Sequence, residues 1–247
     1  MLGVPDRIRA CLFDLDGVLT QTASVHAAAW QEMFDSYLRR RAGWTGERFV
    51  PFDPVADYDA YVDGRPRADG TRTFLASRGI TLPEGGPDDP PGTETVSGLS
   101  TEKNQIVLRR IAAGGATAFP GSVRYVQAVR AAHVPCAVVS ASANCRAVLA
   151  GAGLDGQFDV IIDGTVAEAE RLAGKPAPDT YLAAARRLHL PPAGCAVYED
   201  ALAGVAAGRA GGFGWVVGVD RTGQADALRA EGADVVVQDL AGLLDQP

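Results

Sequence analysis

Residues 8–19, IRACLFDLDGVL, constrain the fold of this 247-residue chain more than any other stretch. The apolar run at residues 9–13 predicts a buried strand of a parallel sheet, and Asp14 and Asp16 follow where that strand ends. Ligands of open α/β sheets bind at the carboxyl ends of strands, so we expect a site here. Extended backbone would put both carboxylates on one side, where a hard divalent cation such as Mg²⁺ would relieve their repulsion. The spacing alone also allows a solvated aspartate turn.

Composition limits the classes of function that the chain can have. Hydrophobic residues make up 47% and charged residues 21%, as in ordinary globular proteins. The net charge of −7 argues against non-specific nucleic-acid binding, so local positive groups must meet any phosphorylated substrate. No apolar run is long enough for a membrane span, and residues 1–10 lack the apolar segment of a signal peptide. We therefore expect a cytoplasmic protein with no membrane partner.

Lysine and cysteine are both scarce. Only Lys103 and Lys175 occur among 23 basic residues, which makes each a candidate for a role that arginine cannot fill, although chance is an alternative. The four cysteines do not have the spacing of a metal site. Three fall in expected core strands and Cys145 follows a loop, so we expect reduced thiols that act as small apolar residues.

The chain changes character between residues 22 and 118, where apolar residues recur at helical spacing. We expect helices at residues 24–41, 71–78 and 100–112, separated by Pro-, Asp- and Gly-rich loops at 51–70 and 81–98. Arg65 and Arg67 flank Pro66 in the first loop, an exposed placement that suits phosphate binding or plain solvation. This helical block predicts a small cap domain inserted into an α/β core formed by residues 1–21 and 119–247.

Strands and helices alternate after residue 119, and polar side chains follow three of the strands. The expected strands are 136–139, 160–162, 195–198, 215–219 and 235–237. Residues 140–144, SASAN, place small hydroxyls and free backbone N–H groups before a helix, as in a phosphate cradle or a plain N-cap. Pro176 and Pro178 stiffen the chain after Lys175. Glu199 and Asp200 end a strand and could complete a metal site begun by Asp14.

The ordered set Asp14/Asp16, Ser140, Lys175 and Glu199/Asp200 resembles the four motifs of the haloacid dehalogenase-like superfamily. FDLDGVLTQT resembles its first motif, and SASAN, GKPAPD and the Glu-Asp pair look most like the β-phosphoglucomutase group. The resemblance implies an α/β Rossmann-like core with a parallel sheet and a helical cap. It implies that Asp14 is a nucleophile, that Asp16 is a general acid and base, and that Asp14, Asp16, Glu199 and Asp200 hold Mg²⁺. It also implies that Ser140, Ala141 and Lys175 bind phosphate.

The same resemblance extends less strongly into the cap. Arg67 matches a Gly-x-x-Arg that binds a second phosphate in the mutases, and Lys103 with Asn104 matches a cap Lys-Asn pair. The remaining matches to hinge and sugar-contacting positions are His26, Trp30, Ser142 and Asn144. Two residues depart from the pattern: Gln21 stands where Asp is frequent, and Ala201 where Ser is frequent.

Three functions remain open at this point. A mutase would interconvert β-glucose 1-phosphate and glucose 6-phosphate through an aspartyl-phosphate and a bisphosphate, and it needs two phosphate sites. A phosphatase would hydrolyse small sugar phosphates. A non-catalytic binding module would require the loss of a core group, and the sequence retains them all. For both the mutase and the phosphatase, the expected partner is a small phosphorylated sugar, and we expect a monomer.

Overall fold

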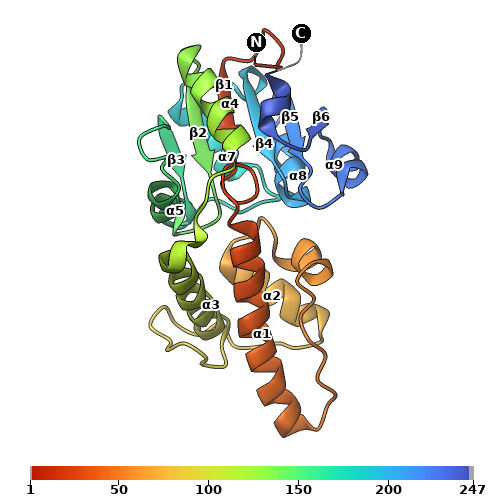
Figure 1. Ribbon diagram of the computed structural model, residues 1–247. Coiled ribbons are helices and arrows are strands. Elements are labelled where there is room, and N and C mark those ends of the chain that lie inside the picture. Colours follow the sequence, from red (N-terminus) through yellow and green to blue (C-terminus); the bar gives the residue numbers. More distant parts are fainter. Residues whose placement is uncertain (1, 245–247) are drawn as a thin grey trace. The chain divides into compact units, whose positions relative to one another are not determined.

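The computed structural model describes residues 2–244 and divides into two compact units. The α/β unit consists of Met1–Gln21 and Ala116–Pro247, and the helical unit consists of Thr22–Gly115 (Figure 1). In the α/β unit, the Gln21 N–H donates to the Thr117 carbonyl at 2.8 Å, and Thr20 bridges Ala118. Thr117 and Ala118, which the sequence placed with the helical insertion, therefore pair with the end of the first segment.

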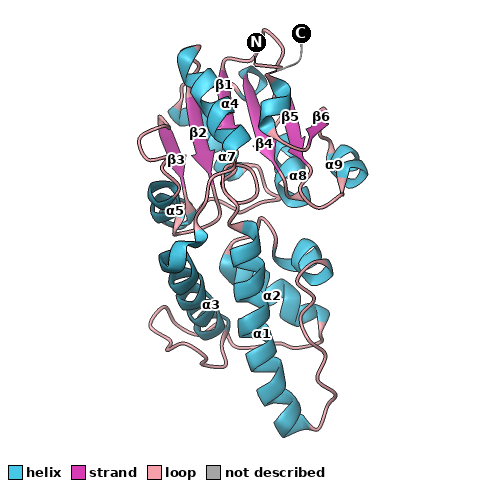
Figure 2. Ribbon diagram, in the orientation of Figure 1, coloured by secondary structure: helices cyan, strands magenta, loops and turns pink. Residues whose placement is uncertain are grey.

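A parallel sheet forms the centre of the α/β unit, and its described strands lie in the order β3-β2-β1-β4-β5-β6 (Figure 2). The strands are β1 (Ala10–Phe13), β2 (Cys136–Val139), β3 (Val160–Ile162), β4 (Cys195–Glu199), β5 (Trp215–Val219) and β6 (Val235–Val237). Four of the six match the sequence prediction to the residue. The predicted α/β fold with a parallel sheet is confirmed.

The three middle strands are buried along their whole length because they are apolar on both faces. Phe13 stacks on Tyr198 of the neighbouring strand at a centroid distance of 4.5 Å. The helices that accompany the sheet are α4 (Pro120–Ala131), α5 (Cys145–Gly151), α6 (Gly164–Ala169), α7 (Asp179–Arg187), α8 (Leu202–Ala210) and α9 (Ala225–Glu231). All four cysteines are buried free thiols, as the sequence predicted.

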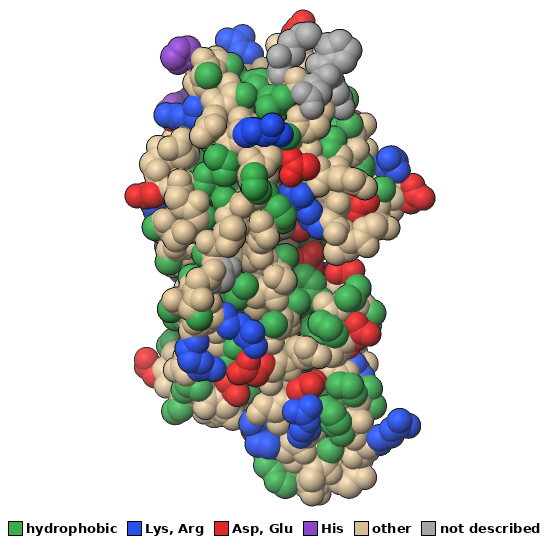
Figure 3. Space-filling view, in the orientation of Figure 1, with side chains coloured by type: hydrophobic (Ala, Val, Ile, Leu, Met, Phe, Trp, Pro, Cys, Tyr) green, Lys and Arg blue, Asp and Glu red, His purple; other side chains and the backbone are tan. Residues whose placement is uncertain are grey.

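The helical unit is built on α1 (Ala23–Thr45), α2 (Arg67–Ser77) and α3 (Val96–Arg110), with short helical turns at Tyr58–Val62 and Ile111–Gly115. Aromatic rings fill its core: Phe34 lies 5.2 Å from Trp30, 5.4 Å from Phe52 and 4.1 Å from Phe74, measured between centroids. None of the described helices is long and apolar enough to cross a membrane. Figure 3 shows basic and acidic side chains interspersed on the face in view.

Two predicted helix starts were wrong, for a shared physical reason. The helix expected at residue 71 begins at Arg67, and the helix expected at residue 100 begins at Val96. The sequence prediction places Gly70 and Gly98 at the ends of the preceding loops, but each glycine lies inside its helix and permits a close contact. A Cβ on Gly70 would lie 3.2 Å from the Trp30 ring, and one on Gly98 would lie 2.5 Å from the Thr93 carbonyl.

Candidate active site

The strand order brings the acidic segments together. Because β1 lies between β2 and β4 and all three are parallel, the segments that follow them meet at one edge of the sheet. One carboxylate oxygen from each of Asp14, Glu199 and Asp200 lies within 4.8 Å of the others. All three residues are buried, with relative exposures of 7%, 0% and 8%. Asp16 is half-buried, and its backbone bridges Thr20.

This carboxylate cluster fits a hard divalent cation. Burial, with Glu199 and Asp16 nearby, raises the pKa of Asp14 well above its ordinary value, although Lys175 opposes the shift. One lysine cannot neutralise three buried carboxylates, and oxygen donors at this spacing are those that such cations prefer. Gly17 permits the close approach: its φ is +84°, and a Cβ there would lie 1.7 Å from Asp200 Oδ2.

Lys175 lies at the centre of the cluster and is 3% exposed. Its Nζ lies 2.5 Å from Asp14 Oδ1 and 2.6 Å from Glu199 Oε1, and it donates to the Val139 carbonyl at 3.2 Å. Burial alone would lower the pKa of Lys175, but Asp14 and Glu199 outweigh burial and raise the pKa above its ordinary value. The ammonium therefore stays charged beside Asp14, where it can meet an anionic ligand.

Tyr181 also belongs to the cluster, although sequence reasoning missed it. Its hydroxyl donates to Glu199 Oε1 at 2.7 Å, and its ring centroid lies 5.1 Å from Lys175 Nζ. Burial and the nearby Glu199 raise the pKa of Tyr181 well above its ordinary value, so the hydroxyl remains a donor. The sequence offered one signal: Tyr181 lies six residues after Lys175, in the first turn of α7. A buried tyrosine hydroxyl needs a hydrogen-bond partner, so a polar partner near Lys175 could have been expected.

The SASAN segment follows β2 at the same edge, but its backbone is less free than predicted. The Ser142 N–H donates to Ser140 Oγ, and the Asn144 N–H donates to Ser142 Oγ, each at 3.1 Å. Two of the N–H groups of this segment are therefore already bonded, because small hydroxyls bond the backbone two residues ahead. Gly164 keeps the segment close to α6, since a Cβ there would lie 2.7 Å from the Ala141 carbonyl.

Three of the predicted residues meet inside the helical unit. Lys103 Nζ on α3 lies 2.8 Å from His26 Nδ1 and 4.7 Å from the centroid of the Trp30 ring, both on α1. All three are buried, with relative exposures of 5%, 9% and 3%. The lysine thus lies over an aromatic face beside an imidazole nitrogen, an arrangement that holds its ammonium in a fixed position.

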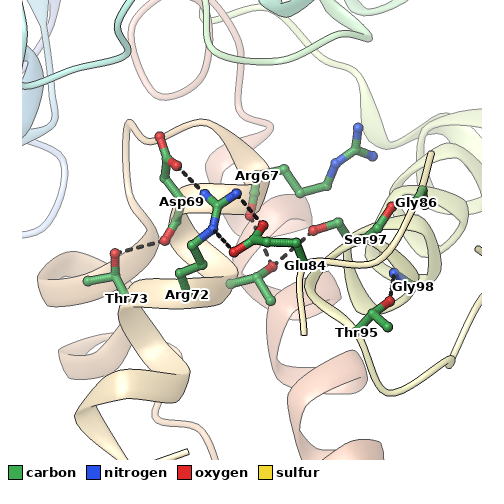
Figure 4. A network of polar contacts seen from close by, with 11 residues as sticks. Arg67, Asp69, Arg72, Thr73, Glu84, Gly86, Thr95, Ser97 and Gly98 are labelled. Carbon is green, nitrogen blue, oxygen red and sulfur yellow. Dashed lines mark hydrogen bonds and ion pairs between the residues drawn. The ribbon is translucent and has the colours of Figure 1, made fainter. Parts of the chain in front are cut away.

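Arg67 is the first residue of α2 and is half-buried, so its predicted exposed loop position was wrong. Its carbonyl accepts a hydrogen bond from Thr71 Oγ1 at 3.0 Å, and Thr71 Oγ1 lies 3.2 Å from Ser100 Oγ on α3. Figure 4 shows the Arg67 side chain pointing away from Arg72 and Glu84. The start of α2 is therefore tied to α3, one turn before Lys103.

The Pro- and Gly-rich segment before α3 is also anchored to α2 (Figure 4). Arg72 binds Glu84 through two hydrogen bonds, 2.9 Å from Nε to Oε1 and 2.7 Å from Nη2 to Oε2. Thr95 caps α3 by accepting from the Gly98 N–H at 2.9 Å. The segment that the sequence predicts as a loop at 81–98 therefore has specific side-chain contacts.

The predicted site residues divide between the two units. The α/β unit contains Asp14, Asp16, Ser140, Ala141, Ser142, Asn144, Lys175, Glu199 and Asp200. The helical unit contains His26, Trp30, Arg67 and Lys103.

Comparison with known proteins agrees with this geometry. The family model described as haloacid dehalogenase-like hydrolase matches residues 8–212. A β-phosphoglucomutase from Mycobacterium bovis is 58% identical over 99% of this chain and 94% of its own length. A trehalose-phosphate phosphatase from Mycobacterium leprae is 38% identical over 52% of this chain and 29% of its own length. The crystal structure of a β-phosphoglucomutase from Clostridium difficile has a TM-score of 0.75 and 26% identity, covering 96% of this chain and 93% of its own. This chain belongs to the haloacid dehalogenase-like hydrolase family, within its β-phosphoglucomutase-like group.

Proposed function

We propose that this chain is a Mg²⁺-dependent β-phosphoglucomutase that interconverts β-glucose 1-phosphate and glucose 6-phosphate. The observation that carries the proposal is the buried cluster in which Asp14 contacts Lys175 beside Glu199 and Asp200. The near-full-length similarity to a β-phosphoglucomutase supports the choice of substrate.

Asp14 is the proposed nucleophile. One of its carboxylate oxygens attacks phosphorus, and the bond between phosphorus and the leaving sugar oxygen breaks, which leaves an aspartyl-phosphate. Asp16 donates a proton to that sugar oxygen and takes a proton back from the sugar hydroxyl in the reverse transfer. Lys175, Ser140 and the Ala141 backbone hold the phosphate oxygens. In the mutase cycle Asp14 starts as an aspartyl-phosphate, formed from a trace of the bisphosphate, and passes its phosphoryl group to the 6-hydroxyl of β-glucose 1-phosphate, which gives β-glucose 1,6-bisphosphate. Asp14 then takes the phosphoryl group from the 1-position, which releases glucose 6-phosphate and restores the aspartyl-phosphate.

The metal would be held by the carboxylates of Asp14, Glu199 and Asp200, with the backbone carbonyl of Asp16. Bound there, Mg²⁺ supplies the positive charge that lets an anionic carboxylate approach a phosphate dianion. In the helical unit, Arg67 is the proposed ligand of the second phosphate, and His26, Trp30 and Lys103, with Ser142 and Asn144 of the α/β unit, are proposed substrate contacts.

A phosphatase acting on small sugar phosphates is the second candidate. The similarity of half of the chain to a trehalose-phosphate phosphatase supports it. In that reaction water attacks phosphorus of the same aspartyl-phosphate, the bond to Asp14 breaks, and inorganic phosphate is released. The two reactions share every proposed step at Asp14 and differ in the acceptor of the phosphoryl group.

The deciding experiment incubates purified protein with β-glucose 1-phosphate, Mg²⁺ and a trace of the 1,6-bisphosphate. We expect glucose 6-phosphate, measured with a coupled dehydrogenase, to exceed free phosphate by a large factor. Release of phosphate without glucose 6-phosphate would reject the mutase in favour of the phosphatase. The isosteric Asp14→Asn variant serves as the control and should form neither product.

A further inference from the structure

The loop that follows β5, residues 220–224, is a fixed turn. Asp220 Oδ1 accepts hydrogen bonds from the Gly223 N–H at 2.7 Å and from the Gln224 N–H at 2.8 Å. The Asp220 N–H in turn donates to the Val237 carbonyl of β6 at 2.8 Å. Gly223 has a φ of +84°, a conformation that glycine adopts readily. The side chains of this loop therefore project from a defined backbone.

Arg221 extends from this loop to the segment that follows β1. Its Nε donates to the Gly17 carbonyl at 2.7 Å, and its Nη1 donates to the Gln238 carbonyl at 2.7 Å. Its guanidinium carbon lies 3.6 Å from the centroid of the Phe119 ring, and only 17% of the side chain is exposed. A planar guanidinium bonded in two directions and stacked on a ring has little freedom to move. It therefore fixes the backbone one residue after Asp16.

Gln224 makes the matching contact on the other acidic segment. Its Nε2 donates to the Asp200 carbonyl at 3.0 Å. One loop thus bonds the backbone of both segments that supply the carboxylates. Because a Cβ on Gly17 would fall 1.7 Å from Asp200 Oδ2, these segments already lie in contact. A shift of either backbone would move the Asp200 carboxylate relative to Asp14.

We propose that Arg221 and Gln224 are positioning residues that set the spacing of the two acidic segments and thereby the affinity of the site for Mg²⁺. The inference rests on the metal site of the proposed function. Neither residue is proposed as a ligand of the metal or the substrate, because their described contacts are to backbone carbonyls and, for Arg221, also to the Asp239 carboxylate at 3.7 Å.

The test measures Mg²⁺ binding by isothermal titration calorimetry in the full-length protein without substrate. Arg221→Met and Gln224→Met remove the donors and keep apolar stems of similar length. We expect the Mg²⁺ dissociation constant to rise about five- to twentyfold in each. The Mg²⁺ concentration for half-maximal activity should rise by the same factor, while kcat at saturating Mg²⁺ stays within about twofold. Arg221→Lys should recover part of the affinity, because an ammonium can still donate to one carbonyl.

The matched control is Arg229→Met on α9, whose exposed side chain pairs only with the exposed Asp226 among the described contacts. It should bind Mg²⁺ as the wild type does. Wild-type affinity in both loop variants, with or without a lower melting temperature, would overturn the inference and leave the proposed function intact. If Arg221→Met fails to fold, Arg221→Lys and Gln224→Met decide by the same criterion. Absence of Mg²⁺ binding by the wild type would overturn both proposals.

Discussion

Glu199 shows how a single hydroxyl can set the electrostatics of the cluster. Its Oε1 accepts a hydrogen bond from the Tyr181 hydroxyl while the same oxygen contacts Lys175. A donor on a carboxylate withdraws negative charge from it, so Tyr181 weakens the hold of Glu199 on the lysine. More of the lysine's charge is then available to a phosphate beside Asp14.

The variant Tyr181→Phe tests this view. It keeps the ring contact with Phe213, at a centroid distance of 5.9 Å, and leaves one donor fewer on the fully buried Glu199. We expect KM for the phosphorylated substrate and the inhibition constant of inorganic phosphate to rise severalfold. The free energy of unfolding, measured in urea, should fall by about 1–3 kcal/mol.

Tyr125→Phe is the matched control for that variant, since the Tyr125 hydroxyl is bonded to the Leu2 carbonyl and the Tyr198 hydroxyl. It should lose stability with KM unchanged. Equal changes of KM in the two variants would contradict the role given to Tyr181.

The elements of the α/β unit were more predictable than those of the helical unit. Strands such as Cys136–Val139 are short apolar runs between polar turns, and burial on both faces requires that composition. The start of α2 could not be predicted from local sequence, because glycine disfavours a helix interior. The reason for Gly70 is its contact with Trp30, which is a tertiary contact. The hydrogen bond from Tyr181 to Glu199 and the hydrogen bond from Arg221 to Gly17 could not be predicted either, because neither follows from spacing along the chain.

The order of the strands explains why the acidic cluster could be predicted from sequence. Asp14 and Glu199 each lie at the end of a continuous apolar run, and the parallel register aligns those ends. By contrast, the hydroxyls of SASAN satisfy their own backbone, which local sequence permits but does not require.

Asp159 joins three elements and gives stability a dependence on pH. It lies before β3 and accepts hydrogen bonds from the Cys136 N–H of β2 at 2.9 Å and from Arg130 of α4 at 3.0 Å. Burial works to raise the pKa of Asp159, but these hydrogen bonds outweigh it and lower the pKa below its ordinary value. Its contribution to stability is therefore present above the unfolded pKa of about 4 and is lost as pH falls through the folded pKa.

The lowered pKa of Asp159 determines the expected result for Asp159→Asn. The variant should melt at a lower temperature than the wild type at pH 7, and the difference should shrink at an acidic pH below the unfolded pKa of about 4, as the wild-type carboxylate gains a proton. Thermal denaturation followed by circular dichroism provides the measurement. Asp226→Asn, a change at an exposed ion pair, should show no such pH-dependent difference. A gap of the same size at both pH values would refute the assignment.

At the scale of the whole molecule, the proposed mutase needs two phosphate sites and hydrolysis of a simple ester needs one. The α/β unit contains the cluster around Asp14, and Arg67 belongs to the helical unit. We therefore expect Arg67→Ala to reduce kcat/KM for β-glucose 1-phosphate by at least about tenfold, with cleavage of an aryl phosphate within about twofold of the wild type.

Arg65→Ala removes the same charge two residues earlier and is the comparison variant for Arg67. Its effect on the mutase reaction should be smaller. Equal losses for the sugar phosphate and the aryl phosphate in Arg67→Ala would argue against a second phosphate site and would favour the phosphatase.

The burial of both lysines affects how the side-chain amines of this chain react with reagents in solution. Lys103 is 5% exposed and lies in the helical unit, while Lys175 is 3% exposed and lies in the α/β unit. An acylating reagent that attacks side-chain amines should therefore react slowly with both while the two units are folded. Each unit carries its own reporter: acylation of Lys103 records opening of the helical unit, and acylation of Lys175 records opening of the α/β unit.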